Sequence, residues 1–288
     1  MQPPLSSRRK RLKRSVLSSL VAVDHYENFP VASLLLPPRF RRPVALIYRF
    51  AREADDFADE GNLPPDTRLA RLDAFRREIG RIETGKSPTI PWFAALADVI
   101  HEYRLPLDLF RDLLSAFSQD VTKTRYANFG EVLDYCRRSA NPVGRLLLCL
   151  YGSWSTQNIV YSDAICSSLQ LINFIQDVAL DYQKGRIYLP QDELARFDVA
   201  EQQIAAGNSG RNWQRFIAFQ IERTRELLYS GTPLGRVLKG RIGMEMRMII
   251  AGGDRVLTKI ARVGGDVFER RPTLQPLDWP LMFLHAVR

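Results

Sequence analysis

Two acidic segments of the chain carry side chains that suit the binding of a divalent cation. In the first segment, four polar side chains recur at intervals of three or four residues: Tyr48, Arg52, Asp55 and Asp59. An α-helix would bring these positions to one face, where the carboxylates of Asp55 and Asp59 repel each other. Asp56 widens the acidic patch. A bound divalent cation would remove this electrostatic penalty.

The second segment places a polar stripe among large apolar residues. Its members are Gln170, Asn173, Asp177 and Asp181, which again follow one face of a helix. Because the residues between them are mostly apolar, this helix is expected to be largely buried, and unpaired carboxylates there would cost several kcal/mol. A metal ion and an anionic ligand would supply the partners.

Either segment alone is explained equally well by an acidic face in contact with water. Two such segments favour a shared metal site, since Mg²⁺ prefers oxygen ligands and is commonly held by a few carboxylates together with substrate phosphates. The two segments together therefore predict chemistry on a diphosphate.

Apolar residues recur every three or four positions along much of the chain, which predicts helices. The stretches are Val44–Ala58, Leu69–Ile82, Phe93–Tyr103, Leu107–Phe117, Val132–Tyr151, Ala164–Leu180, Trp213–Leu228 and Met244–Ile260. Gly and Pro fall between them, and alternating polar and apolar runs bounded by tight-turn pairs are missing. The stretch Ala164–Leu180 is apolar around most of its circumference, which is typical of a helix surrounded by others. We expect an all-α bundle with the second acidic segment on a central helix.

Composition limits the classes of protein that the chain can be. Its 288 residues, 45% of them hydrophobic, predict one domain over residues 19–288 after a basic tail at residues 1–18. The net charge of +9 favours an anionic partner, but nucleic acid is not expected, because no basic stripe is interleaved with aromatic residues. The three cysteines lack CxxC spacing and no apolar segment is long enough to span a bilayer. These features predict a cytoplasmic protein, with any membrane contact peripheral and at the inner face.

The sequence around both acidic segments resembles the squalene/phytoene synthase family. The two aspartate motifs of that family match Asp55-Asp56-Phe57-Ala58-Asp59 and Asn173-Phe174-Ile175-Gln176-Asp177-Val178-Ala179-Leu180-Asp181, and residues 182–190 resemble the segment that follows the second motif. The resemblance extends from about His25 to about Arg271. It implies a single-domain isoprenoid synthase bundle with a central prenyl cavity, a prenyl diphosphate substrate and Mg²⁺ as the cofactor.

Two further segments, His25–Ser33 and Tyr135–Gly144, resemble the branch of this family that forms hydroxysqualene. That branch is associated with converting presqualene diphosphate and water to hydroxysqualene and diphosphate, between a presqualene diphosphate synthase and a hydroxysqualene reductase. Condensing members of the family usually have small apolar residues where this chain has Ser139–Pro142, and many have a tyrosine at Gly252–Gly253. The added polarity favours the hydroxysqualene-forming branch.

The resemblance also implies roles for individual residues. The implied Mg²⁺ ligands are Asp55, Asp59, Asn173, Asp177 and Asp181, with Asp56 assisting. The residues implied to contact the substrate or its diphosphate are His25, Asn28, Phe29, Arg52, Asp56, Tyr135, Gln170, Asn173, Lys184, Arg186 and Tyr188. The implied catalytic residues are Asp55, Asp59, Asp177, Asp181, Tyr48, Ser139 and Asn141. Aromatic faces would stabilise a carbocation, and Ser139 and Asn141 would position the water that ends the reaction.

Other interpretations fit the same motifs. A condensing enzyme would make squalene or a carotenoid precursor from two prenyl diphosphates on this scaffold, and a family member without activity would serve in assembly or at a membrane. Single residues also have structural explanations. Asn141 beside Pro142 fits a helix cap or kink, His25 fits a buried hydrogen bond, and the aromatic residues fit an ordinary core.

Overall fold

The computed structural model describes residues 36–59, 63–269 and 271–287, and for Asp59 it describes the backbone alone. The described residues form helices and connecting turns, with one isolated bridge between Arg125 and Ile187 and no β-strand. The expected all-α fold is confirmed. The expected basic tail at residues 1–18 lies outside the described residues.

The helices have the following bounds along the chain. The first half contains α2 (Pro38–Asp59), α3 (Pro65–Glu83), α4 (Phe93–Tyr103), α5 (Leu107–Asp120), α6 (Phe129–Ser139) and α7 (Asn141–Leu150). The second half contains α8 (Thr156–Gln176), α9 (Val178–Gln183), α10 (Gln191–Arg196), α11 (Glu201–Ala205), α12 (Arg211–Ser230), α13 (Leu234–Val237), α14 (Gly240–Arg262) and α15 (Asp278–Val287). No helix among the described residues is both long enough and apolar enough to cross a bilayer.

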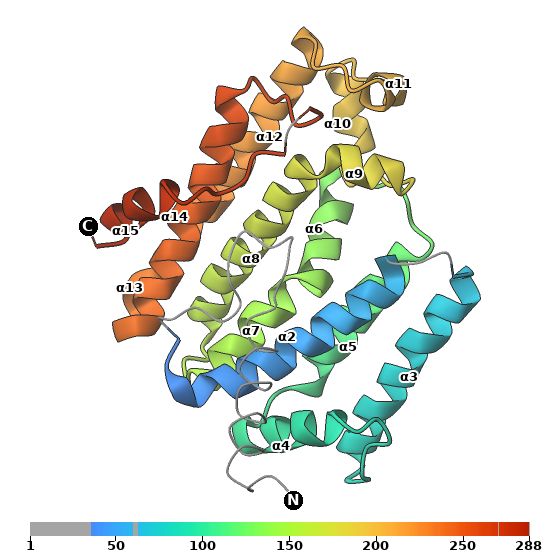
Figure 1. Cartoon of the computed structure of the whole chain (residues 1–288), viewed down its shortest axis with the longest axis vertical. Helices are drawn as coiled ribbons and strands as arrows, with labels where there is room; N and C mark the ends of the chain where they lie inside the picture. The colour runs from blue at the N-terminus through green and yellow to red at the C-terminus, as the bar shows by residue number, and fades with distance from the viewer. Residues whose placement is uncertain (1–35, 60–62, 270, 288) are drawn as a thin grey trace, which may run out of the picture.

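Helix α8 runs through the middle of the bundle, as its apolar circumference predicts. It packs against α6 and α7 on one side and against α12 and α14 on the other, while α2 packs on α3, α4, α5 and α7 (Figure 1). The α7–α8 contact is close, because a Cβ atom at Gly144 would overlap with Ser162 Oγ and lie 2.5 Å from Cys166 Sγ. Only glycine fits at this crossing, which fixes α7 against the central helix.

An aromatic cluster forms the core beneath α2. Phe50 on α2 is fully buried and meets Phe110 on α5 edge to face, with ring centroids 5.0 Å apart, and Phe93 on α4 at 5.9 Å. Phe75 on α3 lies 4.8 Å from Phe93. Such edge-to-face pairs add to the free energy gained by burying the rings. They hold α2 so that its acidic segment lies on the opposite, solvent side.

Two stretches expected to be continuous helices are interrupted, and those two expectations were wrong. Val132–Tyr151 breaks at Ala140, because Pro142 has no N–H to donate and its ring clashes with the preceding turn of a helix. Ala164–Leu180 breaks at Asp177, whose φ of −103° and ψ of 11° depart from helical values. The hydrogen bonds from Asp177 N–H to Asn173 O and from Asp181 N–H to Asp177 O, both 2.8 Å, continue across the break. The second acidic stripe therefore keeps its helical spacing.

Candidate active site

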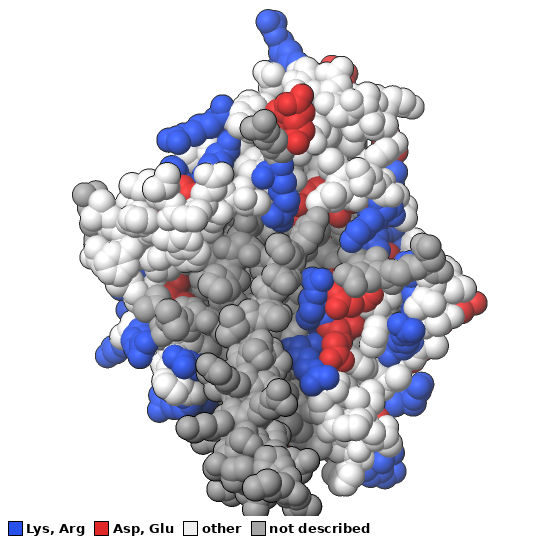
Figure 2. All heavy atoms as spheres, viewed as in Figure 1, with Lys and Arg blue, Asp and Glu red and all other residues white. Residues whose placement is uncertain are grey.

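The first acidic segment lies on the C-terminal half of α2 and is neutralised within its own helix. Arg52 Nε lies 2.9 Å from Asp56 Oδ1, and Arg52 Nη1 lies 3.8 Å from Asp55 Oδ2. Acidic and basic side chains lie next to one another over this part of α2 (Figure 2). Because these pairs join residues three and four apart, the helix alone brings them together.

The second acidic segment is neutralised by a residue far away in the sequence. Asp177, between α8 and α9, forms a two-pronged ion pair with Arg271, which follows α14: Arg271 Nη2 lies 3.0 Å from Asp177 Oδ2, and Arg271 Nε donates to Asp177 Oδ1. Such bidentate pairs fix the orientation of both groups. Sequence reasoning missed Arg271 as a partner of Asp177, because neither periodicity nor spacing links residues that lie 94 positions apart.

Arg186 joins the ends of the two acidic segments. Its backbone N–H donates to Asp181 O at 2.8 Å, and its buried guanidinium donates to Ala58 O on α2 at 3.3 Å. Arg68 on α3 donates to the same carbonyl at 3.2 Å. Carbonyls in the last turn of a helix carry partial negative charge and lack helical donors, so the two guanidinium groups cap α2. The segment after the second motif is thereby held against the first.

Asp120, at the end of α5, lies at the centre of a buried hydrogen-bond network that sequence reasoning missed. It accepts a hydrogen bond from Tyr135 Oη at 2.5 Å and another from Tyr188 Oη at 2.9 Å. Arg186 Nη1 donates to Tyr188 Oη at 3.3 Å, which connects the network to the cap of α2. A signal was present in the sequence, because Asp120 falls three residues after Phe117 on the apolar face of its helix.

The aromatic rings of this network pack on one another. Phe174 and Tyr188 stack with centroids 4.1 Å apart and planes 4° from parallel, and Tyr135 lies 5.8 Å from Phe174. Burial raises the pKa of Tyr135 well above its usual value, and the negative charge of Asp120 raises it further. Tyr135 is thus a protonated donor, and its hydroxyl and that of Tyr188 together orient the Asp120 carboxylate. Both residues are buried with their hydroxyls directed to Asp120, and their predicted contact with substrate stays a prediction.

Ser139 and Asn141, on either side of the α6–α7 break, have different surroundings. Asn141 is buried, and its Oδ1 accepts a hydrogen bond from Ser167 Oγ on α8 at 2.9 Å, which agrees with a structural role beside Pro142. Ser139 Oγ is a buried atom with no hydrogen-bond partner among the described residues. A buried hydroxyl without a protein partner suits an ordered water or a ligand. The structure thus distinguishes between two residues that sequence reasoning had paired.

The remaining predicted residues differ in their exposure and in whether the structure describes them. Tyr48 on α2 and Gln170 and Asn173 on α8 are half-buried, and Lys184 is exposed in the turn after α9. Asp59 lies in the last turn of α2. His25, Asn28 and Phe29 lie outside the described residues, and their predicted contacts with substrate stay predictions.

The donor chemistry of both segments fits Mg²⁺. Asp55, Asp56, Asp177 and Asp181 are half-buried and offer carboxylate oxygens without thiols or imidazoles among them, which is the ligand set of a hard cation. Among the side chains that the structure describes, which do not include Asp59, no three acids, histidines or cysteines form a cluster. The predicted Mg²⁺ site and the central prenyl cavity therefore stay predictions.

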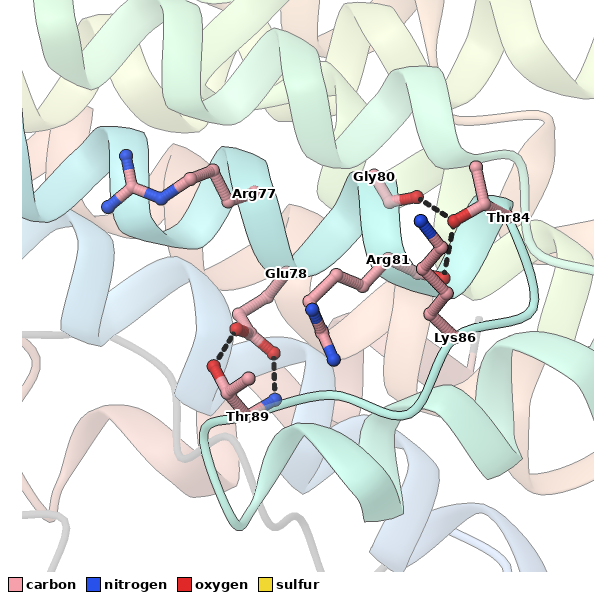
Figure 3. Close-up of a pocket in the computed structure, with 7 residues that line it drawn as sticks. All are labelled: Arg77, Glu78, Gly80, Arg81, Thr84, Lys86 and Thr89. Carbon is pink, nitrogen blue, oxygen red and sulfur yellow. Dashed lines mark hydrogen bonds between the residues drawn. The ribbon is translucent and has the colours of Figure 1, made fainter.

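A surface hollow of about 490 Å³ lies at the C-terminal end of α3, away from these residues (Figure 3). Its lining is basic, with Arg77, Arg81 and Lys86. The carboxylate of Glu78 faces it but accepts hydrogen bonds from the N–H of Thr89 at 2.7 Å and from the Thr89 hydroxyl. Glu78 therefore anchors the following loop, and none of the predicted site residues lines this hollow.

Known proteins similar to this chain agree with its helical architecture and its motifs. A family model described as squalene/phytoene synthase matches residues 22–278. A hydroxysqualene synthase of Rhodopseudomonas palustris is 37% identical over 263 residues, covering 91% of this chain and 88% of that protein. A phytoene synthase of Mycobacterium bovis is 36% identical over 172 residues, covering 60% of this chain and 56% of that protein. The crystal structure of squalene synthase HpnC from Alicyclobacillus acidocaldarius has a TM-score of 0.77 and 33% identity, covering 91% of this chain and 97% of that one.

Proposed function

Because the chain belongs to the squalene/phytoene synthase family, we propose that it converts presqualene diphosphate and water into hydroxysqualene and diphosphate. The similarity to a protein named hydroxysqualene synthase over 91% of this chain supports this reaction. The observation that carries the water-capture step is the buried Ser139 Oγ, which has no partner among the described residues. A carbocation site that must hold one water requires a polar atom of this kind.

The first step breaks the C–O bond to the diphosphate, and the electron pair leaves with the diphosphate. Asp55, Asp59, Asn173, Asp177 and Asp181 would hold Mg²⁺, which would neutralise the charge that builds on this leaving group. Among residues of the chain, Arg52 and Lys184 are exposed and able to turn toward a diphosphate. Their attraction grows as the negative charge develops, which is the condition for a contribution to catalysis.

Arg186 contributes mainly by position. The residue is only 6% exposed, and its guanidinium donates to Ala58 O and Tyr188 Oη. A positive charge held in a partly water-free site acts more strongly on a nearby anion than the same charge in water. Arg186 therefore keeps the ends of both acidic segments in register and adds a fixed positive charge beside them.

The second step forms a new C–O bond. Ionisation leaves a cyclopropylcarbinyl cation, which rearranges. The oxygen of a water molecule then donates an electron pair to it and releases a proton to the departed diphosphate. Ser139 Oγ accepts a hydrogen bond from that water and holds its lone pair toward the cation. A serine hydroxyl is too weak a base to remove a proton from the carbon skeleton, so the reaction ends in an alcohol.

A condensing reaction on two prenyl diphosphates is the second candidate. The similarity to a phytoene synthase over 60% of this chain favours it. The surroundings of Gly253 on α14 argue against it, because a Cβ atom there would lie 3.2 Å from Leu169 Cδ2 and 3.3 Å from Ile172 Cδ1. A side chain at this position would press on the ends of Leu169 and Ile172, which would have to shift by a few tenths of an ångström.

The test is product identification with separate substrates. Purified protein and Mg²⁺ are incubated with presqualene diphosphate or with farnesyl diphosphate, without a nicotinamide cofactor, and the products are identified by mass spectrometry. We expect hydroxysqualene in the incubation with presqualene diphosphate and no product in the incubation with farnesyl diphosphate. Turnover of farnesyl diphosphate would support the condensing reaction, and no turnover of either substrate by folded protein would favour a family member without activity.

A further inference from the structure

The last helix of the chain exposes an unusual number of large apolar side chains. Six residues within and just before α15 are at least 39% exposed: Leu277, Trp279, Leu281, Phe283, Leu284 and Val287. Scattered exposed apolar residues are normal, whereas contiguous ones mark an interaction surface. We call these six residues the α15 face.

The way in which α15 is anchored forces this face outward. Asp278, Met282 and Ala286 are buried and form a single narrow stripe at intervals of four residues, so the rest of the circumference faces away from the bundle. Asp278 Oδ1 lies 2.7 Å from Arg255 Nε, and its other oxygen pairs with Lys259, both on α14. Asp278 is the one acidic residue of α15, and both of its carboxylate oxygens pair with α14. The α15 face therefore has no acidic group.

Basic side chains border the α15 face. Arg247 on α14 donates to Ala286 O at 2.5 Å and to Gly235 O on α13 at 2.7 Å, so one guanidinium joins the end of α15 to α13. Arg236 and Lys239, in and just after α13, are exposed, and residues 231–243 contain no Asp or Glu. An uncharged bulge over α15 lies above basic side chains over α13 (Figure 2).

We propose that the α15 face and its basic border form a docking surface for an anionic lipid bilayer. Exposed Trp, Phe and Leu side chains enter the boundary between headgroups and acyl chains, and neighbouring Arg and Lys bind anionic headgroups. A second copy of the chain is a poorer occupant, because a two-fold pair would bring the same basic residues together without acidic partners. Docking at this face does not depend on which reaction the protein performs.

The test measures binding of the full chain to vesicles. Co-sedimentation is compared between vesicles of equal parts phosphatidylglycerol and phosphatidylcholine and vesicles of phosphatidylcholine alone. We expect binding to the anionic vesicles, weakened at least about tenfold by Phe283→Ser with Leu284→Ser, since two apolar side chains leave the lipid boundary. Arg236→Glu with Lys239→Glu should weaken binding about tenfold.

A charge-matched control comes from the opposite side of the molecule. Arg77→Glu with Lys86→Glu changes the same two residue types in the exposed basic hollow at α3 (Figure 3), whose lining residues include no large apolar side chain. This variant should bind vesicles within about twofold of the unchanged chain. Circular dichroism confirms that each variant is folded.

Two outcomes would overturn the proposal. Equal vesicle binding by the α15 variants, the α13 variants and the unchanged chain would show that lipid contact occurs elsewhere. A dimer in sedimentation velocity that dissociates with Phe283→Ser and Leu284→Ser, while vesicle binding stays the same, would assign the face to self-association.

Discussion

The two acidic segments of the site are stabilised in different ways. On α2, Arg52 and Asp56 are 48% and 34% exposed and pair within one helix. At the α8–α9 break, Arg271 and Asp177 are 21% and 16% exposed and pair across 94 residues of sequence. Screening by water leaves the first pair weak, while the second is shielded and bidentate.

This difference separates an acidic patch paired within one helix from one paired across the fold. The α2 carboxylates have local partners, whereas the second segment is part of the tertiary structure through Arg271, and its neighbours are held by Arg186 and Asp120. A change in the second segment should therefore affect stability and activity together. A change on α2 should affect activity with little effect on stability.

Asp177→Asn should have the largest effect. It leaves the Arg271 guanidinium without its carboxylate, so the free energy of unfolding should fall by roughly 1–3 kcal/mol, and turnover of presqualene diphosphate should fall at least about hundredfold. Urea denaturation and product formation measure the two effects. If Asp177→Asn unfolds at the same urea concentration as the unchanged chain, the Asp177–Arg271 ion pair does not contribute to the free energy of unfolding.

A matched control lies on α8, the helix that precedes Asp177. Asp163 on α8 forms an equivalent pair with Arg145 on α7, with Arg145 Nε 2.9 Å from Asp163 Oδ1. Asp163→Asn should cost a similar stability and leave turnover within about twofold. Adding Arg271→Gln to Asp177→Asn should recover part of the lost stability without restoring turnover, as a double-mutant cycle would measure.

Asp120→Asn should have the next largest effect. Its amide offers one acceptor in place of two, so either Tyr135 or Tyr188 loses its hydrogen bond, and stability should fall by about 1–2 kcal/mol. Turnover should fall more than with Tyr126→Phe, a variant that keeps the ring and removes the hydroxyl to which Gln119 Nε2 donates at 3.2 Å. Equal turnover in the two variants would remove Asp120 from the positioning network.

The pH dependence of stability should reveal the buried tyrosine. Burial, followed by the charge of Asp120, raises the pKa of Tyr135 above its usual value, whereas in the unfolded chain it titrates near its usual pKa of about 10. The unfolded state therefore loses this proton first, and stability decreases as the pH rises above about 10. Tyr135→Phe should make this decrease shallower in urea denaturation series, and an unchanged slope would contradict the assignment.

Ser139→Ala should change the product more than the stability. Removing a buried hydroxyl that lacks a protein partner should shift the free energy of unfolding by less than about 1 kcal/mol, or raise it slightly. The fraction of alcohol among the products should fall, because water is no longer positioned, and elimination to hydrocarbon should increase. The same alcohol fraction as in the unchanged chain would exclude Ser139 from water capture.

Arg52→Gln should have the smallest effect on stability. The pair with Asp56 is exposed and local, so the free energy of unfolding should change by less than about 0.5 kcal/mol. The KM for presqualene diphosphate should rise, since an exposed positive charge near the diphosphate is lost. A stability loss as large as that of Asp177→Asn would mean that the two segments do not differ.

Local features of the site were predictable from the sequence, and long-range ones were not. Helical spacing predicted the all-α fold, the central position of α8 and the shared face of Arg52 and Asp55, because each depends on neighbours in the same helix. The Asp177–Arg271 pair depends on how α14 ends relative to α8. Asp120 carried a signal as an acid on an apolar face, but its tyrosine partners come from α6 and from the segment after α9.

The helix breaks and the helix α15 were also not predictable from the sequence. Pro142 is compatible with a kinked helix or with the start of a new one, and packing against α8 at Gly144 selects the second. Residues 278–287 gave no helical prediction, because Pro280 interrupts a short and largely apolar segment. Ion pairs from Asp278 to α14 hold this segment as a helix.

The most direct test of water capture is the origin of the product oxygen. Presqualene diphosphate is incubated with the protein and Mg²⁺ in water enriched in ¹⁸O, and the alcohol is analysed by mass spectrometry. Cleavage of the C–O bond followed by capture of water predicts one ¹⁸O atom in hydroxysqualene. An unlabelled alcohol with the presqualene skeleton would mean cleavage of the P–O bond, and it would contradict the carbocation mechanism.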